Sequence, residues 1–299
     1  MSFSSDVKAE LCRADIGNKT CAVAECYGIL LYCNTFSANE IKIVTSSRDF
    51  AQRLPKLFRR AFGLEFDQRP CDGENGKLFF TITDGEKTGN ILEAFGYERT
   101  GLLAHHVNLG ILEDEPARAA FVRGAFLAGG SVTNPEKRYH LEIVTDHYLV
   151  SREATALFQD MGFEPKSVSR SGNYITYFKQ SAAIEDILTT IGAPVAAMSI
   201  MSAKIEKDMT NSVNRKVNCD TANVAKTVEA AAEQVAAIRR LRESGTFSAL
   251  PEKLRETAQL RENNPEMSLS ELAEMCDPAV TKSCMNHRMR KLMKLSEDV

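Results

Sequence analysis

The chain has 299 residues, of which 43% are hydrophobic, enough for a sizeable core and about two domains. Its 37 Lys and Arg residues and 40 acids give a net charge of −3, so a nucleic-acid partner has to be met by a local basic patch. Eight scattered cysteines without a Cys-x-x-Cys pair predict free thiols in a reducing cytosol. The start lacks a signal-peptide pattern and no apolar run approaches ~18 residues, so we expect a cytoplasmic protein without a membrane partner.

The first part of the chain predicts a short helix followed by a mixed unit of helices and strands. The short helix is expected over 4–13, with Ser5 or Asp6 as its cap. In one later segment apolar residues alternate with others, which is typical of a half-buried strand. The expected elements are, in order, a helix at about 21–33, β-branched segments near 35–45, a helix at about 47–62, strands near 64–70 and 76–83, and a helix over Gly85–Phe95.

The same order of elements recurs at about 117–192, which indicates an internal duplication. Subtracting 96 from Gly124 gives Gly28, which has a similar small-residue neighbourhood. Gly inside a helix costs roughly 1 kcal/mol against Ala, so Gly124 predicts that the earlier copy's backbone packs closely against its helix. Gly129 and Gly130 are expected to end this helix through a positive φ. We therefore expect an α+β fold in which a tandem αββαββα domain has pseudo-two-fold symmetry, with its first copy over about 21–97.

Beyond the duplication the sequence predicts a linker and then an all-α domain. The linker is expected to contain a short helical stretch, the polar segment Asn211–Asp220 and a longer helix from Thr221 to Ser244. Arg215 and Lys216 in the polar segment either reach phosphates or only solubilise a linker, and the sequence leaves both readings open. The apolar stripe of the longer helix comprises Val224, Val228, Ala231, Val235 and Ile238. The domains expected are a duplicated domain over 1–205, a linker with the long helix over 206–248, and an all-α domain over 249–299.

The last fifty residues predict three helices in a helix-turn-helix layout. The first is expected over Pro251–Asn263, and a capping box that starts at Ser268 opens the second. Asp277-Pro278 ends the second helix, and the third runs from about Thr281 to Leu295. The side chains expected to face inward are Leu269, Leu272, Ala273 and Met275 in the second helix, and Met285, Met289, Leu292 and Met293 in the third.

The third helix carries five cations and no acid between Thr281 and Leu295. A helix of this width fits the major groove, where Arg pairs with guanine edges and Asn with adenine edges, while Lys mostly meets phosphates. A solvated basic face on a small helical bundle is the alternative, and the capping box and the missing acids favour duplex DNA as the partner. The predicted DNA-binding residues are Ser268, Thr281, Lys282, Ser283, Asn286, His287, Arg288, Arg290 and Lys291.

The duplicated unit resembles the LAGLIDADG homing endonucleases, whose motif overlays the segment from Arg123 to Ser131. In that family an acid just before the terminal Gly of each central helix holds a divalent metal for phosphodiester hydrolysis, because hard cations take oxygen ligands. The resemblance implies that Cys33 and Gly129 occupy these two positions, and neither supplies a carboxylate. We therefore expect a nuclease-like scaffold with no catalytic residues, no metal and no other cofactor. The nearby acids Glu25, Glu136 and Glu142 are interpreted as ordinary surface acids.

The whole chain is similar to the bacterial WhiA family of sporulation and cell-division regulators. The similarity rests on Phe121–Ser131, Tyr139–Ile143, the Asn214-Arg215 and Asn218-Cys219 pairs, and the tail from Leu250 to Leu292. It implies a degenerate LAGLIDADG domain joined to a C-terminal helix-turn-helix. It also implies a sequence-specific, nucleoid-associated regulator of transcription, with roles in cell division and chromosome segregation, and in sporulation in some bacteria.

Two other functions are left open by the residues. The first is a metal-dependent nuclease with unusual ligands, which would depend on Glu25 or Glu142. The second is an interaction scaffold whose duplicated unit recruits transcription or cell-division proteins. No pattern in the chain predicts a small-molecule substrate, so the main expectation is a DNA-binding regulator that is not an enzyme.

Overall fold

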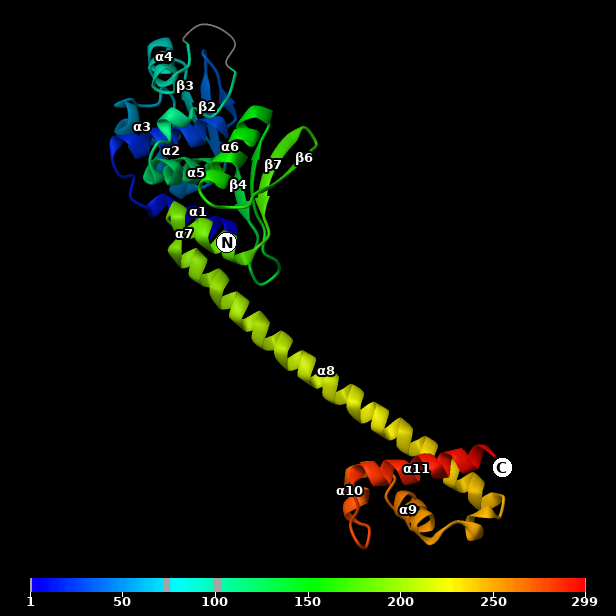
Figure 1. Ribbon diagram of the computed structural model, residues 1–299. Helices are drawn as coiled ribbons and strands as arrows, with labels where there is room; N and C mark the ends of the chain where they lie inside the picture. Colours follow the sequence, from blue (N-terminus) through cyan, green and yellow to red (C-terminus); the bar gives the residue numbers. More distant parts are fainter. Residues whose placement is uncertain (1, 72–75, 99–103, 299) are drawn as a thin grey trace. The chain divides into compact units, whose positions relative to one another are not determined.

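The computed structural model describes residues 2–71, 76–98 and 104–298 (Figure 1). It divides into two compact units, an N-terminal unit over 1–207 and a C-terminal unit over 208–299. Each unit has its own hydrophobic core, so each is described by itself. None of the described helices has the length and apolar content that crossing a bilayer requires.

The N-terminal unit contains the two copies of the duplication, each with a curved antiparallel sheet beside its helices (Figure 1). The first sheet has the order β1-β2-β3 and the second has the order β4-β5-β7-β6. The helices and strands of the N-terminal unit before α8 are, in chain order, α1 (Phe3–Arg13), α2 (Lys19–Leu31), β1 (Thr35–Phe36), β2 (Ile41–Thr45), α3 (Arg48–Phe62), β3 (Leu78–Ile82), α4 (Gly85–Ala94), η1 (Leu109–Ile111), α5 (Glu115–Gly129), β4 (Gly130–Val132), β5 (Leu141–Thr145), α6 (Tyr148–Asp160), β6 (Lys166–Arg170), β7 (Asn173–Phe178) and α7 (Ser181–Ile191).

Side-chain caps fix where the first helices begin, and they correct the predicted starts. The hydroxyl of Ser2 accepts from the Ser5 amide at 3.2 Å, so α1 begins at Phe3 and neither predicted residue is its cap. The carboxamide of Asn18 accepts from the Cys21 amide at 2.8 Å and starts α2 two residues earlier than expected. A side-chain oxygen at the N-cap satisfies one of the helix's free N–H groups, which explains both starts.

The prediction of a strand near 64–70 is wrong, since only Gln68 forms a single bridge, to Thr81. The Asp67 carboxylate turns back to accept from the amides of Thr83 and Asp84 at 2.7 and 2.9 Å. Pro70 has no N–H to add to a ladder. In the described part of the chain the first copy therefore has three strands where the second has four, and there the expected αββαββα order holds only in the second copy.

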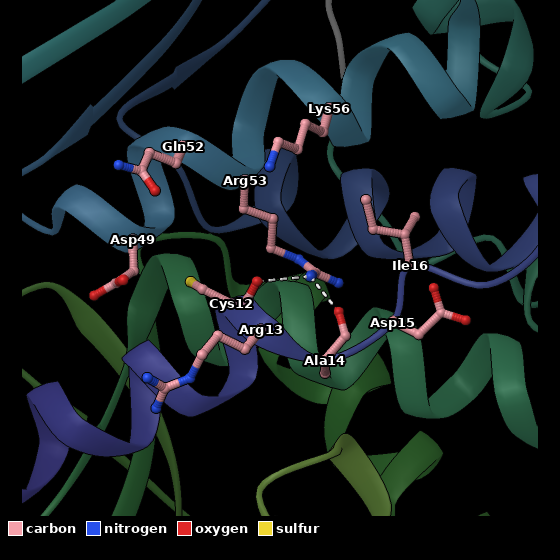
Figure 2. Close-up of a pocket in the computed structure, with 9 residues that line it drawn as sticks. All are labelled: Cys12, Arg13, Ala14, Asp15, Ile16, Asp49, Gln52, Arg53 and Lys56. Carbon is pink, nitrogen blue, oxygen red and sulfur yellow. Dashed lines mark hydrogen bonds between the residues drawn. The ribbon is translucent and has the colours of Figure 1, made fainter. Parts of the chain in front are cut away.

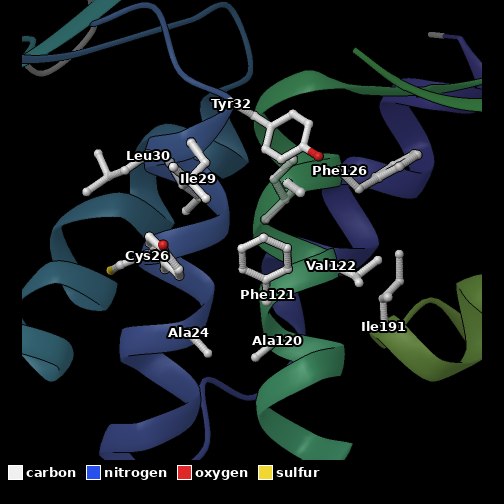
Figure 3. Close-up of a cluster of buried hydrophobic side chains, with 14 of the residues drawn as sticks. Ala24, Cys26, Ile29, Leu30, Tyr32, Ala120, Phe121, Val122, Phe126 and Ile191 are labelled. Carbon is white, nitrogen blue, oxygen red and sulfur yellow. The ribbon is translucent and has the colours of Figure 1, made fainter. Parts of the chain in front are cut away.

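The two central helices α2 and α5 pack backbone to backbone, as predicted from their glycines. A Cβ on Gly28 would lie 2.1 Å from the Phe121 carbonyl oxygen, and a Cβ on Gly124 would lie 2.1 Å from that of Glu25. Because Phe121 and Glu25 are also 96 residues apart, each copy's glycine meets the equivalent carbonyl of the other copy. Figure 3 shows Ala24 and Ala120 facing each other between these helices. This pseudo-two-fold contact lies in the middle of the core.

The segment after the duplication forms one helix, α8 (Pro194–Glu243), and not two helices with a polar break. Asn211–Asp220 contains neither Pro nor Gly, so nothing in it interrupts the helical hydrogen bonds. The Glu10 carboxylate accepts from the amides of Val195 and Ala196 at 2.8 and 3.0 Å and so caps the start of α8. The predicted apolar stripe is buried only at its C-terminal end: Ala231 and Ile238 are buried, Val235 is half-buried, and Val224 and Val228 are exposed.

The C-terminal unit is all-α and packs around two small apolar clusters. The predicted capping box is confirmed, since the Ser268 side chain and the Glu271 carboxylate each accept from the other residue's amide. Met275 is 47% exposed, so the prediction that it packs inward is wrong, whereas Leu272 and Ala273 are buried. After the end of α8 the elements are η2 (Thr246–Ala249), α9 (Glu252–Asn263), α10 (Leu269–Glu274) and α11 (Lys282–Glu297).

Candidate nucleic-acid interface

The helix α11 is held in place by its apolar side and by the turn that precedes it. Met285, Met289 and Leu292 are buried, as predicted, whereas Met293 is half-buried. The Thr281 hydroxyl accepts from the Cys284 amide at 3.2 Å and caps the helix. The amide of Val280 donates to the Ala273 carbonyl at 3.0 Å, which ties the turn to α10.

The loop before α10 is fixed by a buried arginine that the sequence analysis did not single out. Arg261 is 1% exposed, and its Nη1 donates to the Met267 carbonyl at 2.6 Å, with longer contacts to the Asn264 and Pro265 carbonyls. Burial lowers the pKa of Arg261. Its partners are backbone oxygens that no side-chain pattern reports, so the sequence held no signal for this role.

The side of α11 opposite its buried face presents several of the polar residues that the sequence predicted. Ser283, His287 and Arg290 are exposed and recur at helical spacing, and Asn286 is half-buried beside them. Helix α11 has no acid before Glu297. Such a face presents hydroxyl, amide, imidazole and guanidinium groups at once, and these are the groups that contact base edges and phosphates. Four further residues at the start or along α11 are exposed: Thr281, Lys282, Lys291 and Lys294.

Arg288 and Ser268 differ from the other predicted DNA-binding residues. The Arg288 side chain is only 13% exposed, and its Nη1 lies 3.7 Å from the Glu256 carboxylate and 4.0 Å from the Cys276 sulfur. Arg288 therefore braces α11 against α9 and does not lie in the exposed row. The hydroxyl oxygen of Ser268 accepts from the Glu271 amide and caps α10. Its hydroxyl proton remains as a donor to a phosphate.

The two positions that the resemblance leads us to expect for metal-binding acids, Gly129 and Cys33, carry no carboxylate in this chain. A Cβ on Gly129 would lie 2.5 Å from the Val144 carbonyl oxygen and 3.1 Å from the Tyr32 ring, so an acid does not fit there. Burial raises the pKa of the Cys33 thiol to about 12, and the thiol donates to the Leu30 and Thr35 carbonyls. Gly130 has a φ of −91°, so the predicted positive φ is wrong and the glycine at 129 serves close packing.

Glu25 is not a surface acid, and this corrects the sequence interpretation. Its side chain is 0% exposed. Oε1 accepts from Arg53 Nε at 2.6 Å, and Oε2 accepts from Arg53 Nη2 at 2.8 Å and from Arg123 Nε at 2.9 Å. A signal was present: α2 is apolar on all sides, and a charge within such a helix has to be buried and paired.

The other two acids considered as metal ligands are also accounted for. Glu136 is exposed, as interpreted. Glu142 is half-buried, where it accepts from the Ser131 hydroxyl at 3.1 Å and lies 3.0 Å from His140 Nε2. Within the described ranges, no three His, Cys, Asp or Glu side chains converge as a metal site. The arrangement of these acids is that of structural hydrogen-bond partners.

A pocket of about 400 Å³ opens above Arg53, between α1, the loop after it and α3 (Figure 2). Arg53 Nη1 donates to the carbonyls of Cys12 and Ala14 at 3.1 and 2.6 Å, as the dashed lines in Figure 2 show. The charged groups at its rim are of both signs, and Arg53 itself is engaged in holding α1 to α2.

Comparison with known proteins decides what kind of chain carries these two units. The family model for the WhiA LAGLIDADG-like domain matches residues 118–210, and that for the WhiA C-terminal HTH domain matches residues 213–296. A probable cell division protein WhiA from Ruminiclostridium cellulolyticum is 37% identical over 307 residues, covering 100% of this chain and 98% of that protein. The chain belongs to the WhiA family.

Other WhiA proteins agree with this assignment and with the fold. The probable cell division protein WhiA of Clostridium perfringens is 36% identical over 311 residues, covering 100% of this chain and 98% of that protein. The crystal structure of full-length DUF199/WhiA from Thermatoga maritima superposes with a TM-score of 0.62 at 24% identity, covering 100% and 99% of the two chains. The N-terminal LAGLIDADG domain of DUF199/WhiA gives a TM-score of 0.50 at 20% identity, covering 64% and 90%. The predicted fold class, a LAGLIDADG-like α+β domain followed by a helical helix-turn-helix domain, is confirmed.

Proposed function

We propose that this WhiA chain is a double-stranded-DNA-binding regulator that acts in cell division and reads its target through the exposed face of α11. The observation that carries the proposal is that face itself: a helix capped by Thr281, packed inward on Met285 and Met289, and acid-free up to Glu297. The match to the WhiA HTH domain supports it, and the names of the curated relatives point to cell division. A regulator of this kind is expected on the nucleoid.

The residues of the face divide by the chemistry they offer to DNA. Arg290 suits the O6 and N7 acceptors of guanine, and Asn286 suits adenine. Lys282 and Lys291 flank them and suit phosphates, which fix register but carry no sequence information. Arg288 is left out of the reading set because its guanidinium already contacts Glu256.

We also propose that the duplicated unit is not a nuclease. Gly129 lies too close to the Val144 carbonyl to be replaced by an acid, and the high pKa of Cys33 keeps its thiol protonated at neutral pH. Glu25, the acid nearest to these helices' contact, is neutralised by Arg53 and Arg123. The unit is then a platform that the ion pairs hold together.

Binding to duplexes that the full-length chain enriches from a random-sequence pool tests the reading face. Arg290→Ala should weaken specific binding by about 1–3 kcal/mol, the energy of a good bidentate base contact, and Asn286→Ala by a similar amount at a different base pair. Arg255→Ala, a change at an exposed arginine of α9, is the matched control and should bind like wild type. Unchanged affinity in both α11 variants would remove α11 as the reading helix.

A further inference from the structure

The part of α8 that belongs to the C-terminal unit begins with a long exposed stretch. Every residue from Asp208 to Ala230 is exposed, and burial resumes at Ala231. Most helical stability in proteins comes from packing, so a stretch of this length without a covered face is unusual. The WhiA HTH family model starts at residue 213, so most of this stretch is matched together with the helix-turn-helix. The stretch therefore leaves its side chains open to a partner.

The side chains of this stretch separate into two faces. At about 100° per residue, Asn211, Asn214, Arg215 and Asn218 fall on one side of the helix, and Lys226 continues that side. The exposed apolar residues Met209, Val213, Val217, Val224 and Val228 fall on another side.

The amide-bearing face, defined by Asn211, Asn214, Arg215 and Asn218, is uniform in its chemistry. The one acid between Asn211 and Lys226 is Asp220, which points about 160° around the helix from Asn218. Small residues, Ala222 and Ala225, continue the face and leave its approach open.

We propose that the amide-bearing face of α8 is a second duplex-DNA contact, which adds base and backbone contacts to those of α11. Asn pairs bidentately with adenine and Arg with guanine, and both occur here on one helical face that carries no acid between Asn211 and Lys226, with Asp208 and Glu229 one turn beyond its two ends. From Asn211 to Lys226 the helix rises about 22 Å, which spans roughly six base pairs. Arg215 and Lys216 point about 100° apart, and only Arg215 lies on the face. The proposal therefore gives Arg215 the DNA contact and leaves Lys216 as a solubilising residue. The inference rests on the proposed function in taking duplex DNA as the partner.

The test compares two fourfold alanine variants of the full-length chain on the same helix. The face variant changes Asn211, Asn214, Arg215 and Asn218, and the control variant changes Ser212, Lys216, Asn223 and Thr227, which lie together on a different side. Each set removes one cation and at least one amide. Ala is the best helix former, so neither variant should lose helical circular dichroism, and a loss of binding then reports contacts. The probes are duplexes that the wild-type chain enriches from a random-sequence pool, measured by anisotropy and hydroxyl-radical footprinting.

The face variant should bind at least about tenfold more weakly and protect a footprint shorter by roughly three base pairs, the length spanned by residues 211–218, with the control variant like wild type. Arg290→Ala should instead lose contacts in the remaining part of the footprint. A face variant with wild-type affinity and footprint overturns the inference while leaving the proposed function intact. A face variant that changes the mass of the protein in solution but not its footprint shows a protein interface, and also overturns it. A wild-type chain that enriches no duplex overturns both.

Discussion

The arginines of the two units differ in what surrounds them. In the N-terminal unit Arg53 and Arg123 are buried and converge on the carboxylate of Glu25. In the C-terminal unit Arg290 lies on an exposed face of α11 that has no acid. The same residue type therefore holds helices together at Arg53 and Arg123 and is available to a partner at Arg290. The net charge of the chain does not tell these two uses of arginine apart. The burial of each arginine among apolar residues does.

The same difference between an ion-paired and an exposed arginine is found two residues apart within α11, at Arg288 and Arg290. Arg288 shares the side of the helix that packs near Cys276 and Glu256, and Arg290 points about 160° away from it.

Glu25→Gln should destabilise the N-terminal unit by about 3–5 kcal/mol, because it leaves Arg53 and Arg123 buried beside a neutral group. Urea unfolding of the full-length chain followed by circular dichroism measures this. Glu136→Gln, at an exposed acid, is the matched control and should shift stability by less than about 0.5 kcal/mol. Equal midpoints for the two variants would mean that the ion pairs do not hold the unit together.

Gly124→Ala should cost about 1–3 kcal/mol or more, since the added methyl would lie 2.1 Å from the Glu25 carbonyl oxygen and would push α2 and α5 apart. Gly85→Ala provides the comparison, because that glycine has open space and opens α4 without a positive φ. It should be neutral or stabilising by up to about 1 kcal/mol. Thermal unfolding of both variants checks the pair, and a stable Gly124→Ala protein would contradict the close crossing.

Arg288→Ala should lower the stability of the C-terminal unit by about 1 kcal/mol through loss of its contact with Glu256. Arg290→Ala should leave stability within about 0.5 kcal/mol of wild type, because its side chain is exposed. Urea titrations measure the unfolding free energy of both variants, and binding to an enriched duplex measures their DNA affinity. Together they distinguish an arginine that stabilises the fold from one that contacts DNA. A reversal, with Arg290→Ala the less stable protein, would contradict the assignment of the two faces.

A small pH effect is expected at His105 in the N-terminal unit. Burial, then the His147 ring stacked at 4.0 Å, lowers the pKa of His105 from 6.5, while Asp146 and the Phe36 carbonyl oppose the shift. Because the folded-state pKa is depressed, the contribution to stability is complete above 6.5 and is lost as pH falls through the lowered value. His105→Gln should flatten stability against pH just below 6.5. An identical pH slope in the variant would discount this site.

Much of the fold was predictable from the sequence, because glycines, caps and breakers act locally. Gly28 and Gly124 predicted the close crossing of α2 and α5, and Ser268 predicted the capping box of α10. Continuity of α8 was missed because polar composition was taken for a break, although the polar segment contains no helix-breaking residue. Asn has only a modestly lower helix propensity than Ala, whereas Gly and Pro are the residues that interrupt a helix. A polar run without Gly or Pro can therefore continue a helix.

The candidate site was predictable as a face but not residue by residue. The acid-free run on α11 placed Ser283, His287 and Arg290 on its exposed side. Arg288 was misplaced because its partner Glu256 lies on α9, and contacts between helices do not follow from spacing within one helix. Glu25 was misread for a similar reason, since its two partners come from α3 and α5.

The salt dependence of DNA binding tests the central claim, that α11 supplies the charges that meet phosphate. Each cation that contacts a phosphate adds about 0.9 to the slope of log affinity against log salt concentration. Replacing the exposed cations of α11 by Ala should therefore lower the slope by roughly 3, the contribution of its three lysines, for full-length protein on an enriched duplex. The replaced residues are Lys282, Arg290, Lys291 and Lys294.

The control is a variant with four cations of the N-terminal unit replaced by Ala, whose DNA affinity is measured at the same salt concentrations. That set consists of four exposed cations: Arg13, Lys19, Lys56 and Arg60. The account predicts a slope equal to wild type for this variant and the large decrease only for the α11 variant. A slope that falls with the N-terminal set and stays constant with the α11 set would contradict it.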